Sequence, residues 1–337
     1  MLDLEGRAEA EPTEPAELFK PRRFLRNGHL QTIVGNFLAR DNRLPAAEDW
    51  LIEVEPAIRV LCHCHWQPQW ETRPAVVIVH GLEGSSDSQY VIGNGSKAWA
   101  AGMNVIRMNM RTCGGTGHLS RTLYHSGLSN DVAAVIRHLI ERGIQRIGAV
   151  GYSMGGNLVL KMAGEWGGEA PGQLKVVATV SPASDLAASA DALHEPANRV
   201  YEWRFLRSLM QRYREKVSLF PEIYQPAPRS PRSLREFDDI ITAPYSGFTG
   251  AQDYYTRAAS ARVVDRIALP ALVIHSTDDP FVRMTPETRA KLLANPQVTL
   301  LETAHGGHCA FLASPQGYDG RWAERQIVQF FLRKGMA

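Results

Sequence analysis

The stretch Gly151-Tyr152-Ser153-Met154-Gly155-Gly156 decides the fold that this sequence predicts. It ends an apolar run that begins at residue 146 and opens a helical segment. A G-x-S-x-G turn between a strand and a helix forms a nucleophile elbow, in which a tight bend lifts the serine hydroxyl above the edge of a sheet. Glycine at 151 and 155 removes side chains that would collide where the two backbones approach. We therefore expect Ser153 to be a nucleophile.

The alternative interpretation is a glycine-rich turn that carries a serine by chance. The surrounding pattern favours the elbow, because short apolar runs alternate with helical segments and Ser153 follows the third run of the series. The apolar runs span 75–79, 104–110, 146–152, 176–181, 271–275 and 298–302. The helical segments span 90–101, 128–142, 155–164, 286–293 and 321–333. This alternation predicts an α/β fold with a mostly parallel sheet and helices on both faces.

The alternation stops between residues 186 and 265, where Arg, Tyr, Trp and Pro are frequent. Helical stretches at 198–217 and 253–261 indicate a helical cap inserted over the sheet. We therefore expect one core made of residues 21–185 and 266–337, with the cap at 186–265. Before the core's first parallel strand, the sequence predicts a flexible tail over 1–20, a short helix over 34–39 and a hairpin over 50–54 and 60–66.

Composition and charge argue against several classes of protein. The chain has 337 residues, of which 44% are hydrophobic and 21% charged, and its formal net charge is only +2. This balance offers no basic face for a nucleic-acid partner. The sequence contains no run of about 18 apolar residues, so it predicts no transmembrane helix. The N-terminus lacks the basic start followed by an apolar run that a secretory signal has. We expect a soluble cytoplasmic protein, and leave contact with a membrane surface open.

The run Cys62-His63-Cys64-His65 has the residue types of a metal site. Successive side chains of a strand point to opposite faces, so the four could not converge on one ion without a sharp bend. We interpret the run as a structural strand and expect no metal. With Cys113 and Cys309 the chain has four cysteines, which are too few to suggest a disulfide framework.

A serine hydroxyl is a weak nucleophile and needs a base, which in turn needs an orienting acid. In the fold that the elbow indicates, the acid follows the serine and the histidine comes last. The apolar run 271–275 leads into Asp278-Asp279-Pro280. We expect Asp279 to be the acid, with Asp278 as the alternative. The structural interpretation is that both only form a turn, because Asp-Pro pairs favour turns.

The expected base is His308, in Gly306-Gly307-His308 after the apolar run 298–302. The two glycines would let this loop bend and bring the ring to Ser153, and His305 is the competing candidate. His308 would take the serine proton and return it to the leaving group, while Asp279 would hold the imidazole tautomer.

Acyl transfer also needs two donors for the oxyanion of its transition state. One donor is expected to be the backbone N–H of Met154, directly after the nucleophile. The second is expected to be the N–H of Leu82, in His80-Gly81-Leu82-Glu83-Gly84 after the apolar run 75–79. Two further glycine-rich runs, at 112–117 and 247–250, match no phosphate-binding loop and are interpreted as structural bends.

The sequence resembles the YheT-like branch of the α/β-hydrolase superfamily, which includes abhydrolase-domain lipases. The likeness covers roughly residues 22 to 333 and is carried by Asn27-Gly28-His29-Leu30-Gln31-Thr32, His80-Gly81-Leu82-Glu83-Gly84-Ser85, Arg107-Met108-Asn109-Met110-Arg111, Gly114-Gly115, Gly151 to Asn157, Phe237-Asp238-Asp239, Ala243-Pro244, Tyr254-Tyr255, Asp278-Asp279-Pro280 and Gly307-His308. The resemblance implies an α/β-hydrolase fold, hydrolysis of carboxylic esters that include lipid esters, and a triad of Ser153, Asp279 and His308.

These features predict a serine hydrolase that cleaves small-molecule or lipid esters through an acyl-enzyme and needs no cofactor. A thioesterase or a peptidase with the same triad, and a non-catalytic binding protein that kept the fold, are the alternatives. The cap carries apolar side chains that would either line an acyl pocket or pack the cap onto the sheet. They are Trp203, Phe205, Leu206, Leu209, Met210, Phe220 and Phe248.

Overall fold

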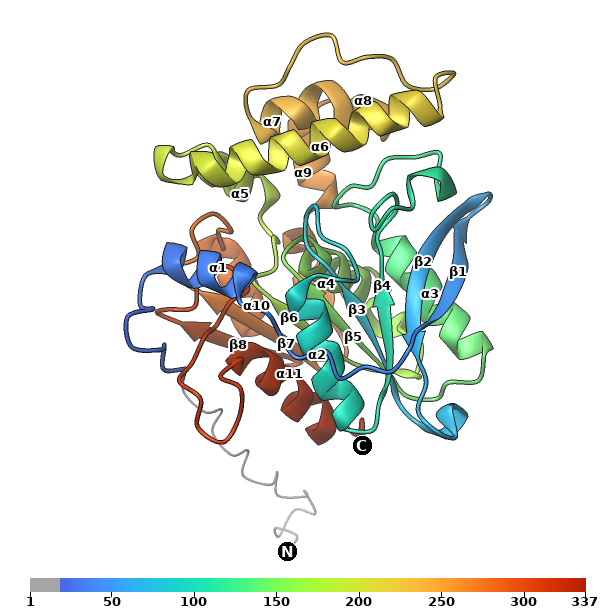
Figure 1. Ribbon diagram of the computed structural model, residues 1–337, viewed down its shortest axis with the longest axis vertical. Helices are drawn as coiled ribbons and strands as arrows, with labels where there is room; N and C mark the ends of the chain where they lie inside the picture. Colours follow the sequence, from blue (N-terminus) through green and yellow to red (C-terminus); the bar gives the residue numbers. More distant parts are fainter. Residues whose placement is uncertain (1–18) are drawn as a thin grey trace, which may run out of the picture.

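A computed structural model describes residues 19–337 and places them around one eight-stranded sheet (Figure 1). The strands are β1 (Glu48–Glu55), β2 (Ile58–His65), β3 (Ala75–Val79), β4 (Asn104–Met108), β5 (Ile147–Tyr152), β6 (Leu174–Val180), β7 (Ala271–Ser276) and β8 (Val298–Thr303). Their order across the sheet is β1-β2-β4-β3-β5-β6-β7-β8. Strands β1 and β2 form an antiparallel hairpin, and β2 also pairs antiparallel with β4. The other pairs, which join β4, β3, β5, β6, β7 and β8 in that order, are parallel. The predicted hairpin and mostly parallel sheet are confirmed.

Helices cover both faces of the sheet because the parallel strands are apolar on both sides. Every residue of β3, β4 and β5 is buried. Val77 and Val79 belong to the core beneath α3 (Ser129–Glu141), α4 (Met154–Trp166) and α10 (Pro286–Ala294). Val76 and Ile78 belong to the opposite core beneath α2 (Gln89–Ala100) and α11 (Trp322–Arg333). Alternate side chains of one strand therefore pack into two separate hydrophobic cores, one on each face of the sheet.

The segment between β6 and β7 is helical and lies across one end of the sheet (Figure 1). It contains α5 (Leu186–Leu193), α6 (Arg199–Leu219), α7 (Leu234–Phe237), a π-helix (Asp238–Thr242), α8 (Ala243–Tyr245) and α9 (Ala251–Ala258). The sequence predicted α6 and α9 within a few residues. It missed α5, α7, α8 and the π-helix, which are short and lack a full amphipathic repeat.

The first helix, α1, spans Gly28–Phe37, so the prediction of a helix over 34–39 was wrong about where it begins. The side chain of Asn27 caps it by accepting the N–H of Leu30 at 3.2 Å. The predicted tail over 1–20 falls almost wholly on residues 1–18, which lie outside the described residues. By Phe19 the chain already packs against the body, with its ring 5.7 Å from that of Phe311.

The turn at Ser153 is held by close backbone contacts. Ser153 has φ 55° and ψ −117°, a conformation that L-residues rarely adopt, and its N–H donates to Val180 O at 2.9 Å. A Cβ on Gly155 would lie 2.4 Å from the carbonyl oxygens of Val79 and His80. One on Gly151 would lie 2.2 Å from the oxygen of Gly155. The strained serine therefore depends on both glycines.

Gly155→Ala should destabilise the fold, because the new methyl group would collide with two backbone carbonyls that cannot move aside. We expect the free energy of unfolding to fall by about 3 kcal/mol. Gly168→Ala is the matched control, since nothing lies within 4 Å of its Cβ position, and it should change stability by less than about 1 kcal/mol. Denaturant unfolding measures both, and equal stability of the two variants would contradict the proposed clash.

Candidate active site

Ser153 lies where two cavities of the protein meet. One runs beneath α5 and α6 and the other opens beside α1, and both are bordered by Ser153, Leu82, Phe205 and Phe281. The bend at residue 153 lifts the side chain out of the sheet, which is otherwise buried at this strand. A group bound at Ser153 could therefore extend in two directions.

The structure brings the expected acid and base together. Asp279 follows β7 and His308 follows β8, and the Nδ1 of His308 lies 2.8 Å from the Oδ2 of Asp279. The other carboxylate oxygen of Asp279 accepts the N–H groups of Phe281 at 3.2 Å and Val282 at 2.9 Å. His308 borders the same cavity as Ser153. Its Nε2 lies 3.7 Å from the Sγ of Cys309, a residue that the sequence did not single out.

The two side chains shift each other's pKa. Burial by itself would lower the pKa of His308. The charge of Asp279, the neighbouring Cys309 and the hydrogen bond to Asp279 outweigh burial and raise that pKa well above its ordinary value. Burial would likewise raise the pKa of Asp279, but His308 and the backbone N–H of Val282 lower it. The carboxylate is therefore ionised at neutral pH and favours a charged imidazole beside it.

Asp278, the alternative acid, points elsewhere. Its Oδ1 accepts hydrogen bonds from the Ser276 hydroxyl at 3.0 Å and the Gly307 N–H at 2.9 Å. Its Oδ2 lies 3.5 Å from the Nδ1 of His305, the alternative base. Asp278 thus holds the loop that carries His308 without contacting the imidazole.

Helix α1 supports the same loop from its other side. The hydroxyl of Thr32 accepts the backbone N–H of His308 at 2.8 Å. The side chain of Gln31 accepts the N–H of Leu312 at 2.9 Å. A Cβ on Gly28 would lie 1.9 Å from the carbonyl oxygen of Asp278, so only glycine fits there. The sequence alone predicts no role for the motif Asn27 to Thr32. The structure shows that this motif positions the loop that carries His308.

The backbone donors expected at the serine have distinct surroundings. The N–H of Gly81 donates to the Tyr90 hydroxyl at 2.9 Å, that of Glu83 to the Tyr124 hydroxyl at 3.3 Å, and that of Gly84 to Gly81 O at 3.1 Å. Within residues 19–337, the N–H groups of Leu82 and Met154 have no hydrogen-bond acceptor. Gly81 brings this loop next to the serine, because a Cβ there would lie 3.0 Å from the Cβ of Ser153. Both N–H groups are thus free to bind an anion.

Comparison with known proteins identifies the family of this chain. Residues 74–315 match the alpha/beta hydrolase fold. The chain belongs to this family. It is 32% identical over 313 residues to the protein named "Putative esterase YheT" of Escherichia coli (strain K12), covering 92% of this chain and 91% of that protein. It is 30% identical over 265 residues to "Phospholipase ABHD3" of Mus musculus, covering 77% of this chain and 63% of that protein.

A solved structure supports the fold alone. The 2,6-dihydroxy-pseudo-oxynicotine hydrolase superposes with a TM-score of 0.58 at 15% sequence identity, over 91% of this chain and 71% of that chain. These matches make the chain an esterase- and lipase-like alpha/beta hydrolase.

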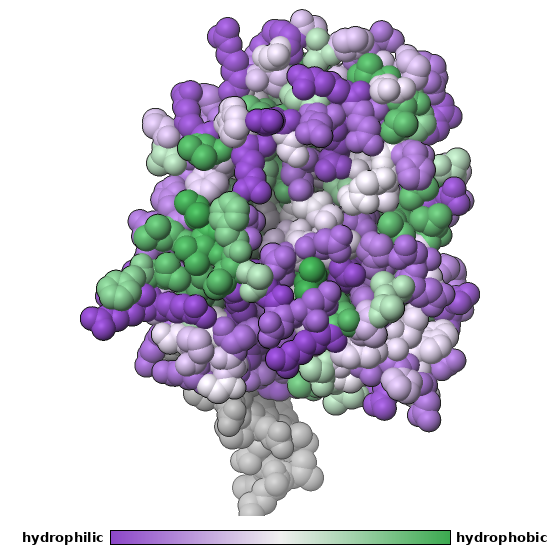
Figure 2. Space-filling model, in the orientation of Figure 1, coloured by the Kyte–Doolittle hydropathy of each residue, from purple (hydrophilic) through white to green (hydrophobic). Residues whose placement is uncertain are grey.

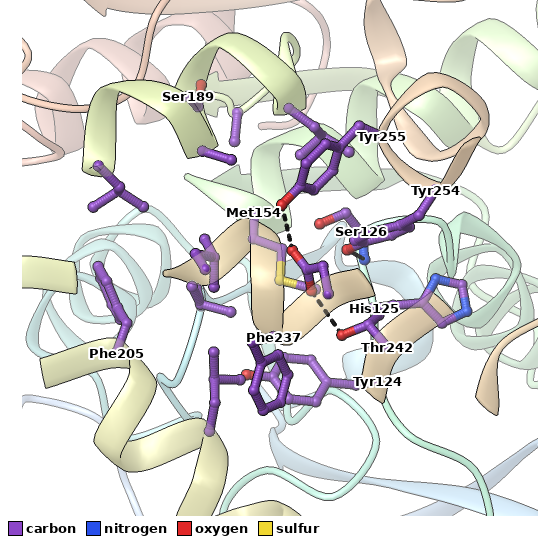
Figure 3. Close-up of a pocket in the computed structure, with 18 of the residues that line it drawn as sticks. Tyr124, His125, Ser126, Met154, Ser189, Phe205, Phe237, Thr242, Tyr254 and Tyr255 are labelled. Carbon is purple, nitrogen blue, oxygen red and sulfur yellow. Dashed lines mark hydrogen bonds between the residues drawn. The ribbon is translucent and has the colours of Figure 1, made fainter. Parts of the chain in front are cut away.

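The more apolar of the two cavities at Ser153 lies beneath α5, α6 and α9 (Figure 3). It encloses about 910 Å³, its mouth included. Its apolar lining is Leu123, Leu186, Leu193, Phe205, Leu209, Phe237, Phe281 and Val282, among others. Asp238 is the buried carboxylate in its wall, and the hydroxyls of Tyr255 and Thr242 both donate to it at 2.7 Å. Burial raises the pKa of Asp238 to about 6.

The apolar side chains expected on the cap have three kinds of surroundings. Phe205 and Leu209 line the cavity beside Ser153. Trp203 is 61% exposed. The remaining four, Leu206, Met210, Phe220 and Phe248, are partly buried and pack onto the core. Packing therefore explains most of them.

The cap is tied to the loop after β3 by a partly buried ion pair. The Nε of Arg212 on α6 lies 3.0 Å from the Oε1 of Glu83, and the Ser208 hydroxyl donates to the same carboxylate. Glu83 neighbours Leu82, so a movement of α6 would also move the free N–H of Leu82. Lys216, further along α6, donates to Gly117 O at 2.9 Å, so the glycine-rich run at 112–117 contacts the cap.

The cysteine and histidine run lies on β2, as predicted. Cys62 and Cys64 are buried in the core. His63 pairs with Asp49 at 2.5 Å, and His65 lies 2.9 Å from Pro45 O. Among the residues that the structure describes, no group of three His, Cys, Asp or Glu side chains is arranged to hold a metal ion. No helix within residues 19–337 has the length and apolar character needed to cross a membrane.

Thr32→Val should loosen the loop that carries His308, because the backbone N–H of His308 then loses its acceptor. We expect the free energy of unfolding to fall by about 1–3 kcal/mol and amide exchange at residues 306–309 to quicken. Thr32→Ser keeps the hydroxyl and serves as the control. Exchange rates that do not distinguish valine from serine would contradict this role.

Proposed function

We propose that this protein is a serine hydrolase that cleaves carboxylic esters through an acyl-enzyme intermediate. Ser153 is the nucleophile, His308 the general base and Asp279 the group that orients the imidazole. The observation that carries the proposal is the pairing of His308 with Asp279 at 2.8 Å on the border of a cavity that the strained Ser153 also lines. Membership of an esterase- and lipase-like family supports the same chemistry.

In the first half of the reaction the Ser153 oxygen attacks the ester carbonyl carbon, and its proton passes to the Nε2 of His308. The positive imidazolium that forms is stabilised by the ionised Asp279 beside it. When the tetrahedral intermediate collapses, the carbon–oxygen bond of the alcohol breaks and His308 gives the proton to the leaving oxygen. The acyl group remains on Ser153.

The carbonyl oxygen gains a negative charge in each tetrahedral intermediate. The N–H groups of Leu82 and Met154 are the donors proposed for it, because both lie beside Ser153 and neither has another acceptor among the described residues. The N-terminus of α4 adds its positive dipole end at Met154. A donor of this kind lowers the barrier by about 3 kcal/mol.

In the second half, water takes the place of the alcohol. His308 removes a proton from the water as it attacks the acyl carbon, and then returns the proton to the Ser153 oxygen. The products are a carboxylic acid and the regenerated enzyme, so the cycle needs no cofactor.

The cavities indicate the class of ester. The cavity beneath α5 and α6 is mostly apolar and suits an acyl chain. The cavity beside α1 carries more polar side chains, including Glu83, Asp87 and Arg204, and suits the alcohol portion. We therefore propose acyl or lipid-type esters as substrates, a class that the phospholipase name of one relative also supports.

Ser153→Ala and His308→Ala should each lower kcat/KM for a p-nitrophenyl ester by about 10⁴-fold, because either change removes a reacting group. Ser153→Ala should also abolish labelling by a fluorophosphonate probe. Asp279→Asn should lose most activity, whereas Asp278→Asn should lose little, because an amide oxygen can still accept the Gly307 N–H. Circular dichroism checks that each variant is folded.

Full activity of Ser153→Ala or His308→Ala would rule out this mechanism. A reversed ranking of the two aspartate variants would reassign the acid. Competition among p-nitrophenyl esters, acyl-CoA and peptides separates the ester hydrolase from a thioesterase or a peptidase. A wild type that neither turns over esters nor reacts with the probe would instead indicate a binding protein.

The pH profile should report the shifted pKa of His308. The imidazole must be neutral to accept the serine proton, so activity is lost as the pH falls through this pKa. Because Asp279 raises it, the acid limb of kcat/KM should lie above pH 6.5. In Asp279→Asn the limb should move to lower pH. A wild-type limb at or below pH 6.5, unchanged in the variant, would contradict the pairing.

A further inference from the structure

Helix α1 presents its apolar side chains to solvent and its small and polar side chains to the protein. Its buried residues are Gly28, Gln31, Thr32 and Gly35. Leu30, Ile33 and Phe37 lie on the opposite face and are 47%, 44% and 73% exposed. The inward face supports the His308 loop through hydrogen bonds, so it has to be polar. Nothing in the fold requires the outward face to be apolar.

The residues beside α1 extend this apolar surface. Phe24 is 80% exposed and Leu38 37% exposed. With the three helix residues they make five of the eleven large hydrophobic side chains that are exposed within residues 19–337. Figure 2 shows a green apolar patch on the left of the molecule, where Figure 1 places α1. An apolar surface gathered on one segment marks an interaction site. We call these five residues the α1 patch.

Basic side chains accompany the α1 patch. Residues 19–44 contain six Lys or Arg and one Asp, a net charge of +5, whereas the whole chain carries only +2. Lys20, Arg22, Arg23 and Arg26 lie on the N-terminal side of α1. No carboxylate of the part of the chain that the structure describes lies within 4 Å of these four. The segment thus combines unpaired positive charge with exposed apolar area, which suits an anionic and apolar partner.

The α1 patch continues into the cavity that reaches the serine. Ile33 and Phe37 form part of the wall of this cavity, together with Arg40. The same cavity is bordered by Ser153 and His308. A molecule lying on the patch would therefore be adjacent to the entrance of the site.

We propose that the α1 patch and the basic residues before it dock the protein onto a membrane containing anionic phospholipid. Phe24, Leu30 and Phe37 would enter the boundary between headgroups and acyl chains, and Arg23 and Arg26 would contact lipid phosphates. A helix that lies in the interface needs no membrane-spanning length. Docking in this position faces the cavity toward the lipids, so an ester could pass from the membrane to Ser153. Binding itself does not depend on the proposed hydrolysis.

The test is flotation of the full-length Ser153→Ala protein with vesicles, so that turnover cannot alter the lipids. Vesicles of phosphatidylcholine with phosphatidylglycerol should bind the protein, vesicles of phosphatidylcholine alone should bind it more weakly, and salt should reduce the difference. Phe24→Ser combined with Leu30→Ser should weaken binding about tenfold or more. Arg23→Gln combined with Arg26→Gln should weaken binding only to the anionic vesicles.

Leu51→Ser is the matched control, since Leu51 is 48% exposed on β1, on the other side of the molecule (Figure 1). It should leave vesicle binding unchanged. Absence of binding to the anionic vesicles would overturn the proposal, as would equal losses in Leu51→Ser and the Phe24 and Leu30 variant. A dimer that dissociates on substitution of Phe24 and Leu30, in a protein that binds no vesicles, would assign the patch to a second copy of the chain.

With Ser153 present, the Phe24 and Leu30 variant should hydrolyse a soluble p-nitrophenyl ester at the wild-type rate, because neither residue borders the cavities at the serine. This readout separates the two proposals. Loss of vesicle binding with normal soluble turnover supports docking, and vesicle binding by a protein without esterase activity leaves docking intact while removing the proposed function.

Discussion

The close approach of two backbones at Gly155 is the constraint on which this end of the molecule depends. The space beside its Cα is taken by the carbonyl groups of Val79 and His80. This contact brings the end of β3 next to the start of α4. The loop after β3 therefore passes beside Ser153, and Leu82 and Met154 border the same cavity as the serine. The strained backbone of Ser153 and the approach of the Leu82 loop to it depend on the same contact.

The histidine loop is held separately, by groups from three parts of the chain. Asp279 contacts the imidazole, Asp278 contacts the backbone at Gly307, and Thr32 contacts the backbone of His308. Two adjacent aspartates thus have different tasks, one electrostatic and one structural. Because α1 supplies the third contact, the helix with the apolar outer surface also holds the loop of His308. The proposed docking and the proposed chemistry both depend on that one short helix.

Much of the fold follows from local sequence patterns. The apolar runs locate the strands from β3 to β8, because a strand covered on both faces has to be apolar throughout. The elbow locates the turn at Ser153, since its glycines are required by backbone clearance. The order of acid and histidine after the serine also predicts Asp279 and His308 as partners. The structure places the Nδ1 of His308 2.8 Å from the Oδ2 of Asp279.

Other features depend on contacts that a local pattern does not contain. The start of α1 was missed because its inward face is polar, which reverses the usual periodicity. The separate tasks of Asp278 and Asp279 are set by the direction of each side chain in a turn. The π-helix at 238–242 and the role of Thr32 depend on segments far apart in the chain. In the sequence, Thr32 stands out only as part of the motif Asn27 to Thr32. That motif does not reveal that its partner is the backbone N–H of His308.

Trapping the covalent intermediate would show whether Ser153 is the nucleophile. The protein is mixed briefly with a p-nitrophenyl ester, quenched in acid, digested and analysed by mass spectrometry. We expect the mass spectra to show one acyl group, on the oxygen of Ser153. An acyl group on another side chain, such as the Cys309 thiol, or turnover with no acylated peptide at any time, would contradict the proposed mechanism.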